Sequence, residues 1–271
     1  MILSFEGTIR EGRALDVRDL DLTAAAVVAA VRGRESSVDV TAPEHGSVHE
    51  RVGHVRPGMG LSTRTALAAA ARSRGLSAPQ DEQLAAVRAE LSTLDCPSVS
   101  TRAERRSVSE QGAETERLRE RVAALRGRVQ AARERGDDTE ELEAELAAAV
   151  RDLSEAETER VAARERFDAA RDAAREARDV REQRLKLADR RANLERAARA
   201  HLVEQVDTEY AEAVAAVPGR TPTNPYEADG VTAALAVGRV AALNAPVVLD
   251  CDRFDSPEAA ASWLDAPVVR L

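Results

Sequence analysis

The chain has 271 residues and a formal net charge of −9 at pH 7; charged side chains make up 32% of it and aromatic side chains only 2%. Because large apolar side chains supply most of the area that a core buries, this composition excludes one deep core spread over the whole length. The two cysteines form no CxxC pair, which excludes a zinc ribbon within the chain, and no run of about 18 apolar residues is present to span a membrane.

The first 78 residues are predicted to form the N-terminal half of a small α/β head. Apolar side chains indicate extended structure in four places, at residues 2–9, 15–17, 38–40 and 48–55. Thr23 can cap an Ala- and Val-rich helix that ends near Gly33. A second helix is predicted from Ser62 to Arg74, because a Pro- and Gly-rich loop precedes it and a glycine follows it.

Residues 79–217 are predicted to form a long antiparallel coiled-coil hairpin. Apolar or small residues recur there at alternating spacings of three and four, and most positions between them are Arg or Glu. In the first arm this seam comprises Val108, Gln111, Thr115, Leu118, Val122, Leu125, Val129 and Ala132. In the second arm it comprises Leu142, Leu146, Ala149, Leu153, Ala156, Ala163, Phe167, Ala170, Ala174 and Ala177.

The tip of the hairpin is predicted at residues 135–139. Gly136 ends the first helix, and Asp138 with Glu141 three residues later resembles a capping box that starts the next helix. Such a short connection forces two amphipathic helices to lie side by side and antiparallel. Pro97 predicts a break near residues 95–100, on one arm only.

Residues 218–271 are predicted to form the C-terminal half of the head. A helix over residues 229–243, a strand over 247–250, a helix over 256–264 and a final strand over 267–271 follow one another. Strand, helix and strand of these lengths make a βαβ unit with parallel strands. Neither end of the chain is large enough to bury a core alone, so we expect one composite head. The fold class is predominantly α, with a small α/β head.

Two segments of the head match motifs of a known superfamily. Residues 58–65 read Gly-Met-Gly-Leu-Ser-Thr-Arg-Thr before a predicted helix, where that superfamily has the phosphate-binding loop GxxxxGK[ST]. The apolar strand ending at Asp250 matches its second, acidic motif. Together with the order of head, helix, turn, helix and head, these segments resemble the SMC and Rad50 families. The resemblance implies a nucleotide-binding head that associates with nucleic acid.

The chain departs from that pattern at several positions. Thr63 and Arg64 stand in place of the second glycine and the lysine, and Cys251 replaces the Glu that follows the acidic strand. The Ser-Gly-Gly signature, the zinc hook and the hinge domain are absent. The resemblance therefore implies a degenerate nucleotide site, because no lysine is present in the loop to hold phosphate.

The loop and the basic segment around it are nevertheless candidates for binding an anion. Glycines before a helix expose backbone N–H groups, and residues 51–80 contain five arginines and no Asp or Glu. The predicted phosphate-binding residues are Arg56, Gly58, Gly60, Ser62, Thr63 and Arg64. Alternatively, these arginines pair with the acidic coil or cap helix ends.

Two further clusters are candidates for binding a metal. Asp250, Asp252 and Asp255 follow a predicted parallel strand, where ligands of α/β sheets bind, and carboxylates are ligands that Mg²⁺ prefers. An acidic loop before a helix cap explains the same residues. His45, His49 and His54 lie close together in sequence but fit no zinc spacing, so a polar loop is the simpler interpretation.

Composition also bears on where the protein works. Lys186 is the only lysine among 39 basic residues, and an acidic, Arg-rich chain is typical of a high-salt cytoplasm. In this style the sequence resembles uncharacterised coiled-coil proteins of haloarchaea, which implies no activity. The N-terminus has neither the basic region nor the apolar run of a signal peptide, so we expect a cytoplasmic, halophilic protein.

Three functions are consistent with the sequence. The first is a non-enzymatic structural or interaction protein that uses the coiled coil as a spacer or partner-binding arm. Its partner would be another protein, or a second copy bound through the coil. The second is a nucleic-acid-associated, SMC/Rad50-like protein with a degenerate nucleotide-binding head, and the third is an active nucleotide hydrolase. We predict no cofactor other than a degenerate nucleotide or Mg²⁺ site, and no membrane partner.

Overall fold

The computed structural model describes residues 1–219 and 222–271, which are mostly helical with two small sheets. They divide into two compact units: residues 1–86 with 191–271 form the first unit, and residues 87–190 form the second. The sequence-based division assigned all of 79–217 to the hairpin, whereas the first unit includes 79–86 and 191–217. Among the described helices, none is long and apolar enough to cross a membrane.

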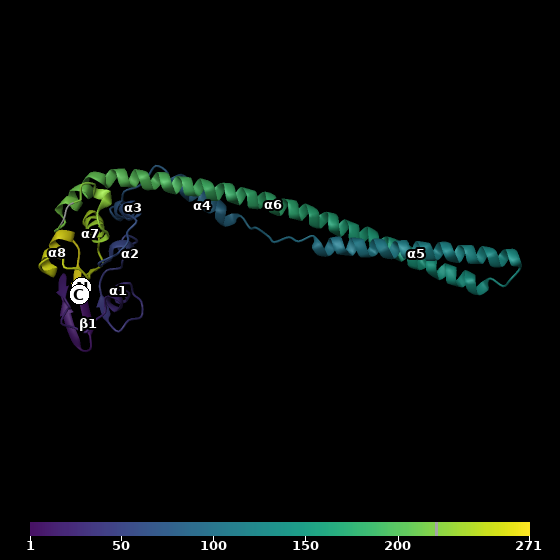
Figure 1. Cartoon of the computed structure of the whole chain (residues 1–271), viewed down its shortest axis with the longest axis horizontal. Helices are drawn as coiled ribbons and strands as arrows, with labels where there is room; N and C mark the ends of the chain where they lie inside the picture. Colours follow the sequence, from purple (N-terminus) through teal and green to yellow (C-terminus); the bar gives the residue numbers. More distant parts are fainter. Residues whose placement is uncertain (220–221) are drawn as a thin grey trace. The chain divides into compact units, whose positions relative to one another are not determined.

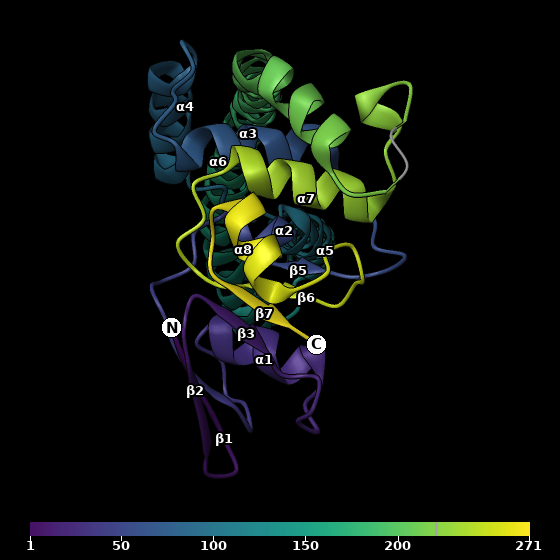
Figure 2. The ribbon, with the colours of Figure 1, turned by 90° about the vertical axis from the view of Figure 1, so that its left-hand side faces the viewer.

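A four-stranded parallel sheet lies at the centre of the first unit (Figure 2). Its order is β3 (Ala14–Asp16), β7 (Val268–Arg270), β6 (Val247–Leu249) and β5 (His54–Val55). All residues of β6 and β7 are buried, as expected for short strands covered on both faces. The predicted parallel βαβ unit is confirmed, with α8 (Pro257–Leu264) between β6 and β7. The sheet thus combines strands from both ends of the chain.

A second sheet of three antiparallel strands has the order β2 (Thr8–Glu11), β1 (Ile2–Phe5) and β4 (Asp39–Thr41). Extended structure was predicted over residues 2–9, and the structure has strands on both sides of a turn that the prediction did not include. The chain turns at Glu6 and Gly7, which have φ values of 47° and 84°, so the segment forms a hairpin. Glycine adopts such angles without strain, and short hairpin turns need them. Helix α1 (Ala24–Val31) follows, capped by Thr23 as predicted.

The expected extended structure over residues 48–55 is only partly present. Residues His49–Val52 form a short helix, α2, and only His54–Val55 form a strand, β5. Val48 and Val52, spaced four apart, are both buried, which places them on one face of a helical turn. Three valines spaced by three and four residues fit a helix as well as an irregular strand.

Helices α3 (Thr63–Ser73) and α7 (Gly230–Val240) pack against each other beside the sheet (Figure 2). The C-terminal part of α6 (Glu140–Ala216) joins the same core. Its buried side chains there are Ala198, Leu202, Val203, Val206, Tyr210, Ala213 and Val214. The 3₁₀-helix η1 (Pro225–Glu227) lies against this core through Tyr226. The largest fully buried side chain, Tyr210, donates to the carbonyl of Pro225 at 3.1 Å.

In the second unit, α5 (Arg102–Arg135) runs alongside α6 (Figure 1). Val122 and Leu125 of α5 form a buried cluster with Ala149, and Leu146 and Leu153 pack around it. Ion pairs join the same helices, at 2.8 Å between Arg119 and Glu157 and at 3.0 Å between Arg133 and Glu143. Gly136, with φ of 77°, ends α5 in the left-handed conformation.

Residues 94–101 are not helical and separate α4 (Asp81–Thr93) from α5, while α6 is continuous. Pro97 lies in this stretch, and proline interrupts a helix because it lacks an N–H and clashes with the preceding turn. On the far side of the interruption, Gln183 of α6 donates to Glu90 of α4 at 3.3 Å.

Candidate functional site

The candidate site lies where the parallel strands of the first unit end. Strand β5 leads into the loop at residues 56–62, and Asp250 follows the end of β6 beside it. The Asp250 N–H donates to the Val55 carbonyl at 2.9 Å. This pairing brings Gly58 and Asp250 to one cavity of about 460 Å³. The cavity is lined by Pro57, Gly58, Asp229, Val231, Asp250, Cys251, Asp252, Arg253 and Leu271.

Helix α7 covers part of the glycine-containing loop. Gly230, the first residue of α7, lies so close to the loop that a Cβ on it would stand 1.9 Å from the Met59 carbonyl oxygen. Gly58 has φ of 69°, a conformation that favours glycine. The hydroxyl of Ser62 donates to Thr65 Oγ1 at 3.0 Å and makes no capping bond to the backbone of α3.

Arg64 lies apart from the cavity that holds Asp250. Its guanidinium stands 5.2 Å from the centre of the Tyr226 ring, a cation–π arrangement. Together with Ser62 it lines a separate groove against α6. Arg56 is exposed and is not among the residues that line either depression. The six predicted phosphate-binding residues are therefore divided between different surfaces, and only Gly58 shares a cavity with Asp250.

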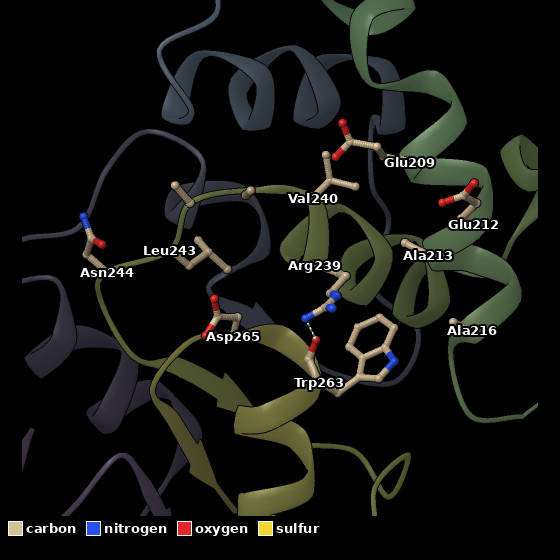
Figure 3. Close-up of a pocket in the computed structure, with 12 residues that line it drawn as sticks. Glu209, Glu212, Ala213, Ala216, Arg239, Val240, Leu243, Asn244, Trp263 and Asp265 are labelled. Carbon is tan, nitrogen blue, oxygen red and sulfur yellow. Dashed lines mark hydrogen bonds between the residues drawn. The ribbon is translucent and has the colours of Figure 1, made fainter.

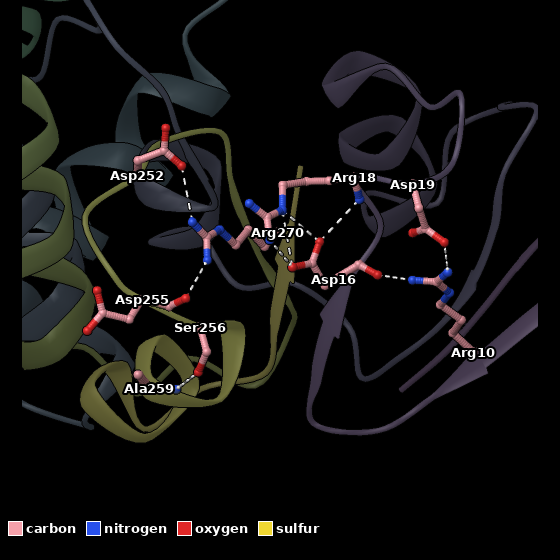
Figure 4. A network of polar contacts seen from close by, with 9 residues as sticks. All are labelled: Arg10, Asp16, Arg18, Asp19, Asp252, Asp255, Ser256, Ala259 and Arg270. Atoms are coloured by element: carbon pink, nitrogen blue, oxygen red, sulfur yellow. Dashed lines mark hydrogen bonds and ion pairs between the residues drawn. The ribbon is translucent and has the colours of Figure 1, made fainter.

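An arginine, Arg270, lies between two of the three predicted metal ligands, Asp252 and Asp255 (Figure 4). It is 93% buried, and it donates to the Asp252 carboxylate at 3.1 Å and to the backbone carbonyl of Asp255 at 3.0 Å. Its Nε has no hydrogen-bond partner. Residues 1–219 and 222–271 contain no group of three or more His, Cys, Asp or Glu side chains placed to hold a metal ion. Asp250 and Asp252 line the cavity, but Asp255 does not.

The charges in the cavity are largely compensated. Burial opposes ionisation of Asp229, but hydrogen bonds from Thr232 and the nearby Arg253 hold the pKa of its carboxyl below the ordinary value. Arg253 approaches this carboxylate at 3.3 Å. Burial raises the pKa of the Cys251 thiol. A neutral thiol is a poor nucleophile, so this cavity is better suited to binding than to covalent chemistry.

A second carboxylate lies on the other side of Arg270. Asp16, at the end of β3, accepts hydrogen bonds from Arg18, including one of 2.6 Å (Figure 4). These bonds from Arg18 lower the pKa of the Asp16 carboxyl, and the charge of Arg270 adds to the effect. The Arg10 guanidinium donates to the backbone carbonyl of Asp16 and to the carboxylate of Asp19. The network joins β3 to the loop after β6 by charge.

The three histidines do not form one metal site. His49 is 1% exposed, and its Nε2 lies 2.7 Å from the Pro246 carbonyl. Burial lowers the pKa of His49, so it is neutral at pH 7. The His45 ring contacts the His49 ring edge-on at 5.9 Å. His45 lies in a loop, His49 in α2 and His54 in β5, and the three side chains are not placed to bind one metal ion.

The sequence did not predict a further cavity of about 650 Å³ beside the end of α6 (Figure 3). Glu209 and Glu212 of α6, Arg239 of α7, and Trp263 with Asp265 near the end of α8 line it. Arg239 donates to the Trp263 carbonyl at 2.6 Å, while Glu209 accepts from Arg74 at 2.5 Å. Trp263 is the only tryptophan in the chain, and it is the one residue whose type could have drawn attention to this cavity.

Comparison with known proteins gives one match. A family model described as a family of unknown function (DUF7856) matches residues 12–268. No curated protein and no solved structure matches the chain.

Proposed function

We propose that this chain, which belongs to the DUF7856 family of unknown function, is a non-enzymatic structural and interaction protein. In this proposal α5 and the facing part of α6 act as an antiparallel coiled-coil arm, which serves as a spacer or binds a partner. The partner is another protein or a second copy of the chain.

The observation that carries the proposal is the packing of α5 against α6. The two helices bury a narrow seam around Val122, Leu125 and Ala149. Ion pairs such as Arg119–Glu157 and Arg133–Glu143 flank the seam. Such packing supports an arm that satisfies its own apolar seam and leaves its outer faces to solvent or to a partner.

Two exposed apolar side chains of α6 offer contacts for a partner. Val161 is 59% exposed and Leu185 is 62% exposed. Large apolar side chains that stand alone on a surface are common, so these two positions do not identify the partner. They do give sites at which a bound partner can be detected.

Site-specific photocrosslinking in native cells tests this proposal. A carbene-forming residue would replace Val161 or Leu185, and matched controls would carry it at Ala163, 1% exposed, and at Ile9 of the first unit, 70% exposed. We expect a discrete product from the α6 positions and none from Ala163, and mass spectrometry identifies it as a second copy or another protein. Products from Ile9 alone, or from no position, would contradict a partner-binding arm.

A second candidate function is a nucleic-acid-associated protein with a degenerate, SMC/Rad50-like nucleotide-binding head. It is favoured by one observation: the loop before α3 and the Asp250 end of β6 lie on neighbouring parallel strands and share one cavity. Ligands of α/β sheets bind at this edge. The stretch that includes Arg56 and Arg64 also contains five arginines and no Asp or Glu, which favours an anionic partner on the first unit.

DNA binding by the full chain tests the second candidate. We expect binding that weakens in Arg56→Ala and in Arg64→Ala, and that falls as salt rises, because phosphate contacts release counterions. If the wild-type chain binds no DNA at low salt, this candidate is wrong. Turnover of ATP that Asp250→Ala abolishes would instead support an active hydrolase.

A further inference from the structure

A groove of about 820 Å³ lies on the first unit, between the start of α3 and α6. Three elements far apart in the sequence contribute to it: the start of α3, residues 196–208 of α6, and η1. The lining includes Ser62, Arg64, Thr65, Arg196, Arg199 and Tyr226. The residues of α6 and η1 carry no motif, so sequence patterns alone do not connect them with the loop before α3.

Three guanidinium groups in this groove lack a carboxylate partner. Within residues 1–219 and 222–271, no ion pair involves Arg64, Arg196 or Arg199. Arg196 donates only to the side-chain oxygen of Asn193, and Arg64 stands over the Tyr226 ring. Some other arginines of the first unit are paired, as Arg74 is with Glu209 at 2.5 Å, and those without an ion pair in the described residues, such as Arg34, Arg51 and Arg56, lie outside this groove. The groove therefore concentrates unused donors of positive charge.

The carboxylates of Glu204 and Asp207 also line the groove, and within the described residues only one of them already accepts a hydrogen bond from a neighbouring side chain. Asp207 accepts a hydrogen bond from the Tyr226 hydroxyl, so part of its capacity is already used. Glu204 is exposed and has no ion pair in the described chain. Three guanidiniums thus face one engaged and one free carboxylate, in a protein whose net charge is −9. The local excess of positive charge favours an anionic ligand.

The geometry favours phosphate over other anions. Arg196 and Arg199 are three residues apart on α6 and share a face of the helix, and Ser62 and Thr65, which both carry hydroxyls, line the same groove. Guanidinium forks match the oxygens of phosphate in two-bond contacts. The Tyr226 ring is already occupied, by Arg64 at 5.2 Å and by the Tyr210 ring at 5.5 Å. Because that ring is not free to stack on a base, contacts here read the backbone and not the sequence.

We propose that this groove binds the sugar–phosphate backbone of nucleic acid through Arg64, Arg196 and Arg199. The proposal deepens the second candidate function and rests on it. It names a binding surface on α3, α6 and η1, distinct from the cavity at the end of the parallel sheet. Binding at this surface depends on charge and is independent of base sequence.

Fluorescence anisotropy with labelled duplex and single-stranded DNA of mixed sequence tests the proposal on the full chain. The test variant is the double substitution Arg196→Gln and Arg199→Gln. The matched control is Arg181→Gln with Arg184→Gln, which removes the same charge from exposed positions of the same helix. Circular dichroism spectra and thermal unfolding verify that both variants fold. Affinity is measured from about 50 mM to about 200 mM salt, where phosphate contacts produce a steep dependence.

We expect the groove variant to bind more weakly and its plot of log affinity against log salt to be shallower by about two units, one for each lost phosphate contact. The control should match the wild type. Equal losses in both variants would overturn the groove, because they would reflect net charge alone. If Arg56→Ala weakens binding while the groove variant does not, the groove is wrong and the second candidate function stands. If wild type binds neither probe, both are wrong. If an acidic protein displaces the labelled DNA and unlabelled DNA does not, the groove binds a protein and the proposal is wrong.

Discussion

The close approach of α7 to the loop after β5 makes Gly230→Ala a sharp test of the candidate site. A Cβ at this position would stand 1.9 Å from the Met59 carbonyl oxygen and 3.0 Å from its carbon. Both are backbone atoms, so no side-chain rotation relieves the clash. Overpacking costs about 1–3 kcal/mol, and the better helix propensity of alanine recovers at most about 1 kcal/mol. We expect a net loss of about 1–2 kcal/mol in the free energy of unfolding.

Urea unfolding followed by Trp263 fluorescence measures this loss in the first unit, because the chain has no other tryptophan and Trp263 packs on Phe254 at 5.6 Å. With a denaturant slope of about 1–3 kcal/mol per molar, the midpoint should fall by roughly 0.5–1 M. Gly60→Ala is the matched control: a Cβ there meets no atom within 4 Å, and its stability should lie within about 0.5 kcal/mol of wild type. Equal midpoints for the two variants would mean that α7 does not hold the loop, and would remove the basis of the shared cavity.

Three further predictions concern other parts of the chain. Leu125→Ala in the seam of the second unit should cost about 2–3 kcal/mol, seen in the helical circular dichroism signal while the Trp263 transition is unchanged; a shift of the Trp263 transition would contradict independent units. Asp229→Ala removes the cap of α7 and should cost about 0.5–2 kcal/mol. The folded pKa of Asp229 is lowered, so the Asp229 carboxylate stabilises the fold above the unfolded pKa of about 3.9. This stabilisation is lost as pH falls through the folded pKa. In Asp229→Asn, the urea midpoint should therefore fall less steeply as the solution is acidified. Burial lowers the folded pKa of His49, so stability should fall as pH drops below the unfolded value of about 6.5, and His49→Gln should flatten the urea midpoints measured between about pH 7 and pH 5.

Local patterns predicted the elements whose signals are contained in a few neighbouring residues. Thr23 and Gly136 act at helix ends where capping chemistry places them. The βαβ unit followed from a fully apolar strand and a Ser-Pro helix start. The hairpin turn at Glu6 was missed because glutamate rarely adopts positive φ, and only the glycine after it carried a signal.

The position of the candidate site residues depended on long-range packing. Asp250 could be placed at a strand end, and the pairing of β5 with β6 then brought it to Gly58. Arg64 could not be assigned, because the direction of its side chain depends on how α3 packs and on the position of Tyr226. Arg270, buried between the predicted metal ligands, reads in sequence as an ordinary basic residue at the end of a strand.

The interleaved strand order has a consequence for how the protein forms during synthesis. Strands β3 and β5, made early, are not neighbours; β6 and β7, made last, lie between them. The parallel sheet therefore cannot assemble until β6 and β7 have left the ribosome. Contacts between α5 and α6 across the turn at Gly136 are local and can form much earlier. Until β6 and β7 are made, β3 and β5 of a nascent chain have no partner in this sheet, and their exposed edges are of the kind that chaperones protect.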